Sequence, residues 1–124
     1  MTIKRFEEMK VWQDARMLTK TIYEITDNRR FNKDFGLKDQ IQRASVSVMS
    51  NIAEGYERDN SKELVRFLLY SKGSIGEVRS LLCVASDLSY ISDSEFRRTR
   101  ETAIAISAQI ANFIKYLRSR ITRV

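Results

Sequence analysis

Proline is absent from this chain of 124 residues, and glycine occurs only four times. Proline breaks the interior of a helix and glycine weakens it, so a chain that almost lacks both can be helical along nearly its whole length. We therefore expect an all-α protein. At this length one domain with one hydrophobic core is the default, and residues 1–124 are assigned to it.

Apolar residues recur at alternating spacings of three and four, which is the period of one helix face. Residues 29–36 break this pattern and are expected to form a loop. Asn60, or the residue after it, with Glu63, and Ser92 with Glu95 look like helix starts. Long helices joined by short connections have antiparallel neighbours, so the expected fold is an antiparallel up-down-up-down four-helix bundle. Three of the four predicted helices are residues 7–28, 37–58 and 94–121, and the remaining one starts after an N-cap at Asn60 or Ser61 and carries its apolar face to Leu88.

Two features of the third predicted helix bear on its packing. Gly73 and Gly76 each cost about 1 kcal/mol relative to alanine inside a helix, so we expect a closely approaching backbone to offset that cost. Cys83 lies among apolar neighbours and is expected to be a small buried core residue. A single cysteine cannot form an internal disulfide, which favours a cytoplasmic setting.

The chain contains no histidine, which excludes imidazole base catalysis, most zinc sites and the histidine-dependent hydrolases. Glu54 and Glu77 are the only carboxylates we suspect of chemistry, and two carboxylates make a weak metal-site signal. We expect no enzyme, cofactor or metal. The N-terminus does not resemble a signal peptide, and the longest uncharged stretch, 13 residues, is too short to span a bilayer. A soluble protein without membrane contact is expected.

The net charge is +6 and the isoelectric point is near 9.7. The excess of positive charge lies toward the two ends of the chain. Such a balance favours a polyanionic partner, because lysine and arginine release counterions from phosphates. Solubility alone is the alternative explanation.

Arginines crowd the start of the fourth helix, where the helix dipole disfavours each cation by about 0.3–1 kcal/mol. A second basic cluster lies at the end of that helix, where the dipole favours it. Solvated arginines without a partner are the alternative interpretation. The candidate nucleic-acid contacts are Arg97, Arg98, Arg100, Lys115, Arg118, Arg120 and Arg123, together with Arg43 and Arg58.

No residue from 102 to 114 is charged, although a surface helix normally shows charges on one face. The stretch predicts self-association, and the alternative is a helix enclosed by the other helices of a monomer. The candidate interface residues are Ile104, Ala105, Ala108, Ala111 and Phe113.

A polar row runs along the second helix at spacings of three and four, from Arg43 to Arg58. It indicates either a solvated face with an ion pair between Glu54 and Arg58, a hydrogen-bond network with the third helix, or a ligand site. The network would comprise Ser47, Asn51, Glu54, Ser74 and Glu77.

The run from Gly36 to Gly55 reads GLKDQIQRASVSVMSNIAEG, and Gly73 is followed by Ser74. With Phe6 and Trp12 near the start, these elements resemble the four-helix-bundle family encoded in intervening sequences of bacterial large-subunit ribosomal RNA genes. The chain is also similar to accessory variability proteins of diversity-generating retroelements. The family commonly has proline where Asn32 and Met49 stand here, so an unbroken second helix is expected.

The resemblance implies an antiparallel four-helix protomer that assembles as a homopentamer, with no established enzymatic activity. The leading hypothesis is a cytoplasmic homo-oligomer that binds nucleic acid, with RNA expected, through repeated basic patches. The competing hypothesis is a scaffold that docks a protein such as a reverse transcriptase, where the positive charge only complements an acidic surface.

Overall fold

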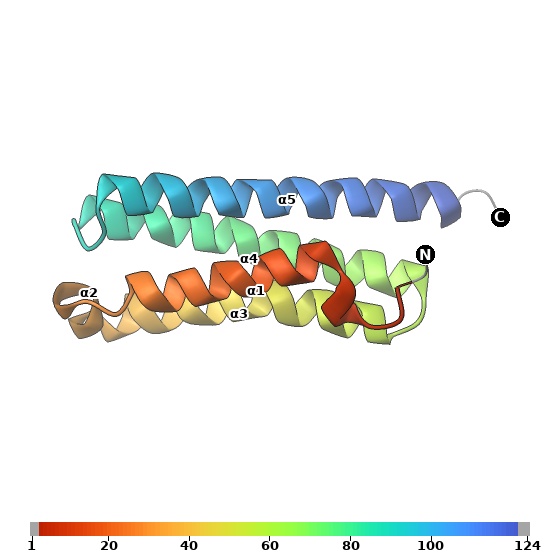
Figure 1. Ribbon diagram of the computed structural model, residues 1–124, viewed down its shortest axis with the longest axis horizontal. Helices are drawn as coiled ribbons and strands as arrows, with labels where there is room; N and C mark the ends of the chain where they lie inside the picture. The colour runs from red at the N-terminus through yellow and green to blue at the C-terminus, as the bar shows by residue number, and fades with distance from the viewer. Residues whose placement is uncertain (1–2, 122–124) are drawn as a thin grey trace.

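The computed structural model describes residues 3–121 as an all-α protein, as the sequence predicts. Four long helices lie side by side along the long axis, and no strand occurs among the described residues (Figure 1). The elements are the 3-10 helix η1 (Phe6–Glu8) and the α-helices α1 (Lys10–Ile25), α2 (Arg29–Lys33), α3 (Phe35–Glu57), α4 (Ser61–Asp87) and α5 (Asp93–Ile121).

The long helices bury one stripe each along the axis of the bundle. Helix α1 packs against α3 and α5, and α4 packs against the same two helices. Fully burying one aliphatic side chain of this kind stabilises a fold by about 1.5–3 kcal/mol, so this core is the main source of stability. Its completely buried large side chains include Leu18, Ile22, Ile41, Ile52, Leu68, Ile75, Leu82 and Ile110.

The bundle has two distinct ends (Figure 1). The short helix α2 and the turn at residues 88–92 lie at one of them, which we call the α2 end. The turn at residues 58–60 and the last turns of α5 lie at the other, which we call the opposite end. This arrangement decides which basic residues are neighbours.

The first predicted helix is wrong at both of its ends. Met9 adopts an extended conformation and separates η1 from α1, which ends at Ile25. Burial of Met9 against the core and an edge-on contact between Phe6 and Trp12, with ring centroids 5.2 Å apart, favour this interruption.

The predicted loop at residues 29–36 is also wrong, because it contains the whole of α2 and the start of α3. The side chain of Asn28 accepts a hydrogen bond of 2.9 Å from the backbone N–H of Phe31 and so caps α2. Phe31 is completely buried and anchors the short helix. Asp34 then caps α3 through the N–H of Leu37. Helix α3 continues without interruption to Glu57, as the replacement of the expected prolines predicts.

The close backbone approach predicted at Gly73 and Gly76 is wrong, since a Cβ at either position would meet nothing within 4 Å. The close approach occurs instead at Gly55, where a Cβ would lie 2.7 Å from Cβ of Phe67 in α4. The buried position predicted for Cys83 is wrong too, because its side chain is exposed on α4. Residues that are adjacent in a helix point to different sides of it, so the apolar neighbours of Cys83 did not determine whether its side chain is buried.

Candidate nucleic-acid interface

The uncharged stretch of α5 is only half covered by the rest of the chain. Ala103, Ile106 and Ile110 point into the core, Ser107 and Gln109 are half-buried, and the other side chains between residues 103 and 110 are exposed. Phe113 is half-buried and packs against the core. The alternative of a helix enclosed by its own bundle therefore does not hold. We call the exposed residues the uncharged face of α5, and they are Ile104, Ala105, Ala108 and Ala111.

Helix α5 is joined to α1 through Asp14. Gln109 donates a hydrogen bond of 2.8 Å to Oδ2 of Asp14, and Nζ of Lys10 lies 2.5 Å from the same oxygen. Burial raises the pKa of Asp14, but the hydrogen bonds from Lys10 and Gln109 outweigh it and hold this pKa below its ordinary value. This polar contact holds one side of α5, next to the uncharged face, against α1.

The first basic cluster of α5 lies at the α2 end. Arg97, Arg98 and Arg100 are all exposed, and none forms an ion pair with a carboxylate in residues 3–121. Asp93 and Glu95 in the first turn provide the negative charge that the helix N-terminus favours. The three arginines are thus available to a polyanion.

The second basic cluster lies at the opposite end. Lys115, Arg118 and Arg120 are exposed, and Arg120 lies over the ring of Tyr116 at 5.7 Å from its centroid. Arg123 lies outside the described residues. At 1.5 Å of helical rise per residue, Arg97 and Arg120 are roughly 35 Å apart along α5. One protomer therefore does not bring the two clusters into a single site.

The candidate contacts outside α5 are already engaged by carboxylates. Arg43 pairs with Asp39 at 2.9 Å. Arg58 lies 3.4 Å from Glu54 and 4.0 Å from Glu63, and its guanidinium lies over the ring of Phe67. Their positive charge is therefore partly compensated within the protomer.

The polar row of α3 divides into two parts. Ser74 of α4 donates a hydrogen bond of 2.9 Å to Oγ of Ser47, and the amide of Asn51 donates to the backbone oxygen and Oγ of Ser47. Glu54 lies apart from this group in its pair with Arg58, and Glu77 accepts a bond from Gln40. The structure thus joins Ser47, Asn51 and Ser74 and leaves the two glutamates elsewhere.

The described part of the chain offers no metal centre. Among these residues, no group of three histidine, cysteine, aspartate or glutamate side chains is placed to hold an ion. Glu54 and Glu77 each have a hydrogen-bond or ion-pair partner of their own. The structure therefore does not pair these two glutamates with each other.

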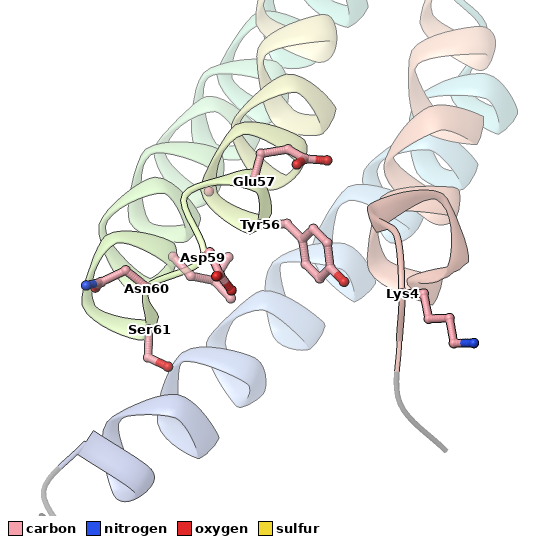
Figure 2. Close-up of a pocket in the computed structure, with 8 residues that line it drawn as sticks. Lys4, Tyr56, Glu57, Asp59, Asn60 and Ser61 are labelled. Atoms are coloured by element: carbon pink, nitrogen blue, oxygen red, sulfur yellow. The ribbon is translucent and has the colours of Figure 1, made fainter.

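A hollow of about 530 Å³ lies at the opposite end, beside the α3–α4 turn (Figure 2). Glu57 and Asp59 line it together with Tyr56, whose hydroxyl donates a bond of 2.8 Å to the backbone oxygen of Ile3. Lys4 points away from the other labelled side chains. The two carboxylates would repel phosphate, so this hollow does not extend the basic surface.

Sequence reasoning missed a basic surface at the α2 end. The segment from Arg29 to Lys38 has a net charge of +3, and this signal was present in the sequence. Arg30 donates to the backbone oxygens of Leu88 and Ser89, which ties α2 to the α4–α5 turn. The four cations of this segment therefore share one end of the bundle with the first cluster of α5. They are Arg29, Arg30, Lys33 and Lys38.

The sequence model of the 23S rRNA-intervening sequence protein family matches residues 7–112. The chain belongs to this family. One solved structure similar to it is a protein of unknown function from the S23 ribosomal protein family of Bacteroides thetaiotaomicron. The two chains are 19% identical, with a TM-score of 0.78 over 85% of this chain and 98% of that one. At this identity the likeness shows the fold alone. Among proteins with curated descriptions, none matches this chain.

The part matched to the intervening-sequence protein family contains most of the candidate interface. It includes the uncharged face, the first basic cluster of α5 and the cations of the α2 end, whereas Lys115, Arg118 and Arg120 follow it. No helix among the described residues is long and apolar enough to cross a membrane.

Proposed function

We propose that this intervening-sequence protein is a non-enzymatic homo-oligomer that binds nucleic acid, with RNA as the expected ligand. The protomer is an antiparallel four-helix bundle, and by resemblance the assembly is a homopentamer. The observation that carries the proposal is the uncharged face of α5, which is exposed in the protomer and flanked on the same helix by two basic clusters.

The uncharged face supports self-association because its side chains suit close packing. Ala105, Ala108 and Ala111 are small, so another helix can approach the backbone, and Ile104 adds apolar area. Contact between this face and a different surface of the next copy would close into a ring if the rotation between copies allows it. Water would be excluded from apolar surface that one protomer leaves uncovered.

Assembly would also place the basic clusters in a repeated array. Each copy brings a net charge of +6 and two unjoined clusters roughly 35 Å apart along α5. A long polyanion could contact several clusters at once, and each neutralised phosphate adds about 0.7–0.9 to the salt dependence of binding. Several clusters that contact one polyanion together should therefore bind it more tightly than a single exposed cluster does.

Light scattering tests the assembly. The wild-type protein should have a mass several times the 14.5 kDa of the protomer. Ala108→Arg, which places a charge on the uncharged face, should lower that mass while the circular dichroism spectrum stays helical. Met17→Arg, at an exposed position of α1, is the matched control and should leave the mass unchanged. A wild-type mass near that of one protomer contradicts the proposal.

Fluorescence anisotropy tests the ligand. Labelled RNA should bind the wild-type protein at low salt and dissociate as salt rises. If no RNA or DNA binds even at low salt, the nucleic-acid function is wrong whatever the mass of the assembly.

A protein-docking scaffold is a second candidate, favoured by exposed apolar side chains on α4. Leu69, Tyr70 and Val84, together with Leu88 just after the end of the helix, are all exposed and could contact a partner such as a reverse transcriptase. Capture of a partner from nuclease-treated extract would favour the scaffold. Loss of that partner after nuclease treatment would favour RNA.

A further inference from the structure

The α2 end presents an aromatic ring to solvent. Phe35, the first residue of α3, is 79% exposed, which is more than any other large hydrophobic side chain in the described range. The cap of α3 is provided by Asp34, and no aromatic contact within residues 3–121 involves the Phe35 ring. Neither the start of the helix nor the core therefore requires a phenyl group at this position.

A hollow of about 520 Å³ adjoins the ring. Phe35, Gly36, Lys38, Asp39 and Gln42 line it. Gly36 has no Cβ, and the nearest atom to a Cβ built there would be Oδ1 of Asp34 at 4.0 Å. The hollow that the phenyl ring lines is therefore not crowded on its Gly36 side.

Cations lie in and near this hollow: Lys38 lines it and donates a hydrogen bond to the neutral Oδ1 of Asn32, and Arg29 and Lys33 belong to α2, which contacts α3. Arg29 and Lys33 are exposed, and neither forms an ion pair with a carboxylate of the described residues. Both nearby carboxylates are already engaged. Asp39 pairs with Arg43 at 2.9 Å, and Asp34 accepts bonds from the N–H of Leu37 and the hydroxyl of Tyr90.

We propose that Phe35 is a stacking platform for an unpaired base of single-stranded RNA, with Arg29, Lys33 and Lys38 binding the flanking phosphates. The inference rests on the proposed RNA-binding function and names the class of RNA. An aromatic face can stack only on a base that is not paired inside a duplex. The same segment of a second copy is a poorer occupant, because two segments of net charge +3 would repel one another.

The test compares a short single-stranded RNA with the same RNA annealed to its complement, by fluorescence anisotropy. Wild-type protein should prefer the single strand. Phe35→Ala should weaken single-strand binding roughly fivefold to a hundredfold and leave duplex binding unchanged. Phe35→Trp should retain the single-strand affinity, since it keeps an aromatic face. Fluorescence of 2-aminopurine in the RNA should be quenched by wild type and not by Phe35→Ala.

Met17→Ala is the matched control. Met17 is 56% exposed and shares a hollow with Arg16 and Lys20, so it is an apolar side chain among cations without a ring. This variant should bind single-stranded RNA as wild type does.

The outcomes separate this inference from the function on which it rests. If wild type binds RNA and Phe35→Ala binds the single strand equally well, the stacking platform is wrong and RNA binding stands. If Phe35→Ala lowers the mass by light scattering, the ring is a contact between copies and the inference is wrong. If wild type binds no RNA at low salt, both proposals fail.

Discussion

Gln109 of α5 and Asp14 of α1 are joined by a hydrogen bond of 2.8 Å across 95 positions of sequence. The bond connects the first and last long helices of the bundle, and Lys10 adds a positive charge at the same carboxylate oxygen. A carboxylate that accepts two such bonds is stabilised in its charged form, which lowers its pKa in the folded state.

This contact predicts a pH dependence of stability. The pKa of Asp14 is lower in the folded chain than its ordinary value of 3.8, so its contribution is present above that value and is lost as the pH falls through the folded pKa. Asp14→Asn should cost about 1 kcal/mol in the free energy of unfolding at neutral pH and less in acid. Urea unfolding at neutral pH and in acid measures the difference. Asp39→Asn is the control, because Asp39 belongs to an exposed ion pair and its replacement should change the free energy of unfolding little. If Asp14→Asn lowers the free energy of unfolding equally at both pH values, the prediction is wrong.

Gly55→Ala should destabilise the chain although alanine favours helices. The added Cβ would lie 2.7 Å from Cβ of Phe67 and 3.1 Å from Cδ1 of Leu64. We expect a loss of about 1–3 kcal/mol, since the clash outweighs the helical gain. Gly73→Ala is the control and should stabilise by up to about 1 kcal/mol, because nothing lies near its Cβ. Thermal and urea unfolding measure both, and similar changes in the two variants would show that the close approach is absent.

Asn28→Ala should loosen the α2 end. Oδ1 of Asn28 caps α2, and Nδ2 donates bonds of 3.0 Å to the backbone oxygens of Ile25 and Tyr90. Loss of the cap and both donated bonds should cost about 2 kcal/mol in unfolding experiments. Asn28→Ser keeps a cap acceptor without placing a charge beside the two carbonyl oxygens, and should lose less. Asn60→Ala removes an exposed cap alone, so a larger loss there than at Asn28 contradicts this role.

The first arginine cluster of α5 should govern the salt dependence of RNA binding. Replacing Arg97, Arg98 and Arg100 by glutamine should lower the slope of log affinity against log salt by about 2 for single-stranded RNA, if each contacts one phosphate. Arg43→Gln is the control, because Arg43 already pairs with Asp39. Anisotropy titrations at several salt concentrations give the slopes; an unchanged slope in the triple variant would remove the cluster from the interface.

The sequence predicted the long helices best where capping residues mark their starts. Asn60 accepts a bond from the N–H of Glu63, and Ser92 and Glu95 bond one another reciprocally, so α4 and α5 begin within one residue of the prediction. Helix α2 was missed because five residues are too few to show a period. Its existence depends on burial of Phe31, which is a tertiary contact.

The candidate site was less predictable because it depends on distances between elements. The sequence indicated that Arg97 and Arg120 belong to separate clusters, and one interpretation of the polar row included the ion pair between Glu54 and Arg58 that the structure contains. It did not show that Arg43 is held by Asp39. The bond between Ser47 and Ser74 was foreseen as part of a network, whereas the glutamates assigned to it point to other partners. The exposure of Phe35 also escaped sequence reasoning, which placed this residue in a loop rather than at the start of α3.

Short connections between the helices bear on how quickly this chain folds. One residue separates α2 from α3, and residues 58–60 separate α3 from α4. Helices adjacent in the sequence can therefore pair early, and such low contact order is typical of chains that fold in microseconds to milliseconds. The α1–α5 pairing spans nearly the whole chain, so we expect it to form last and to open first in hydrogen exchange.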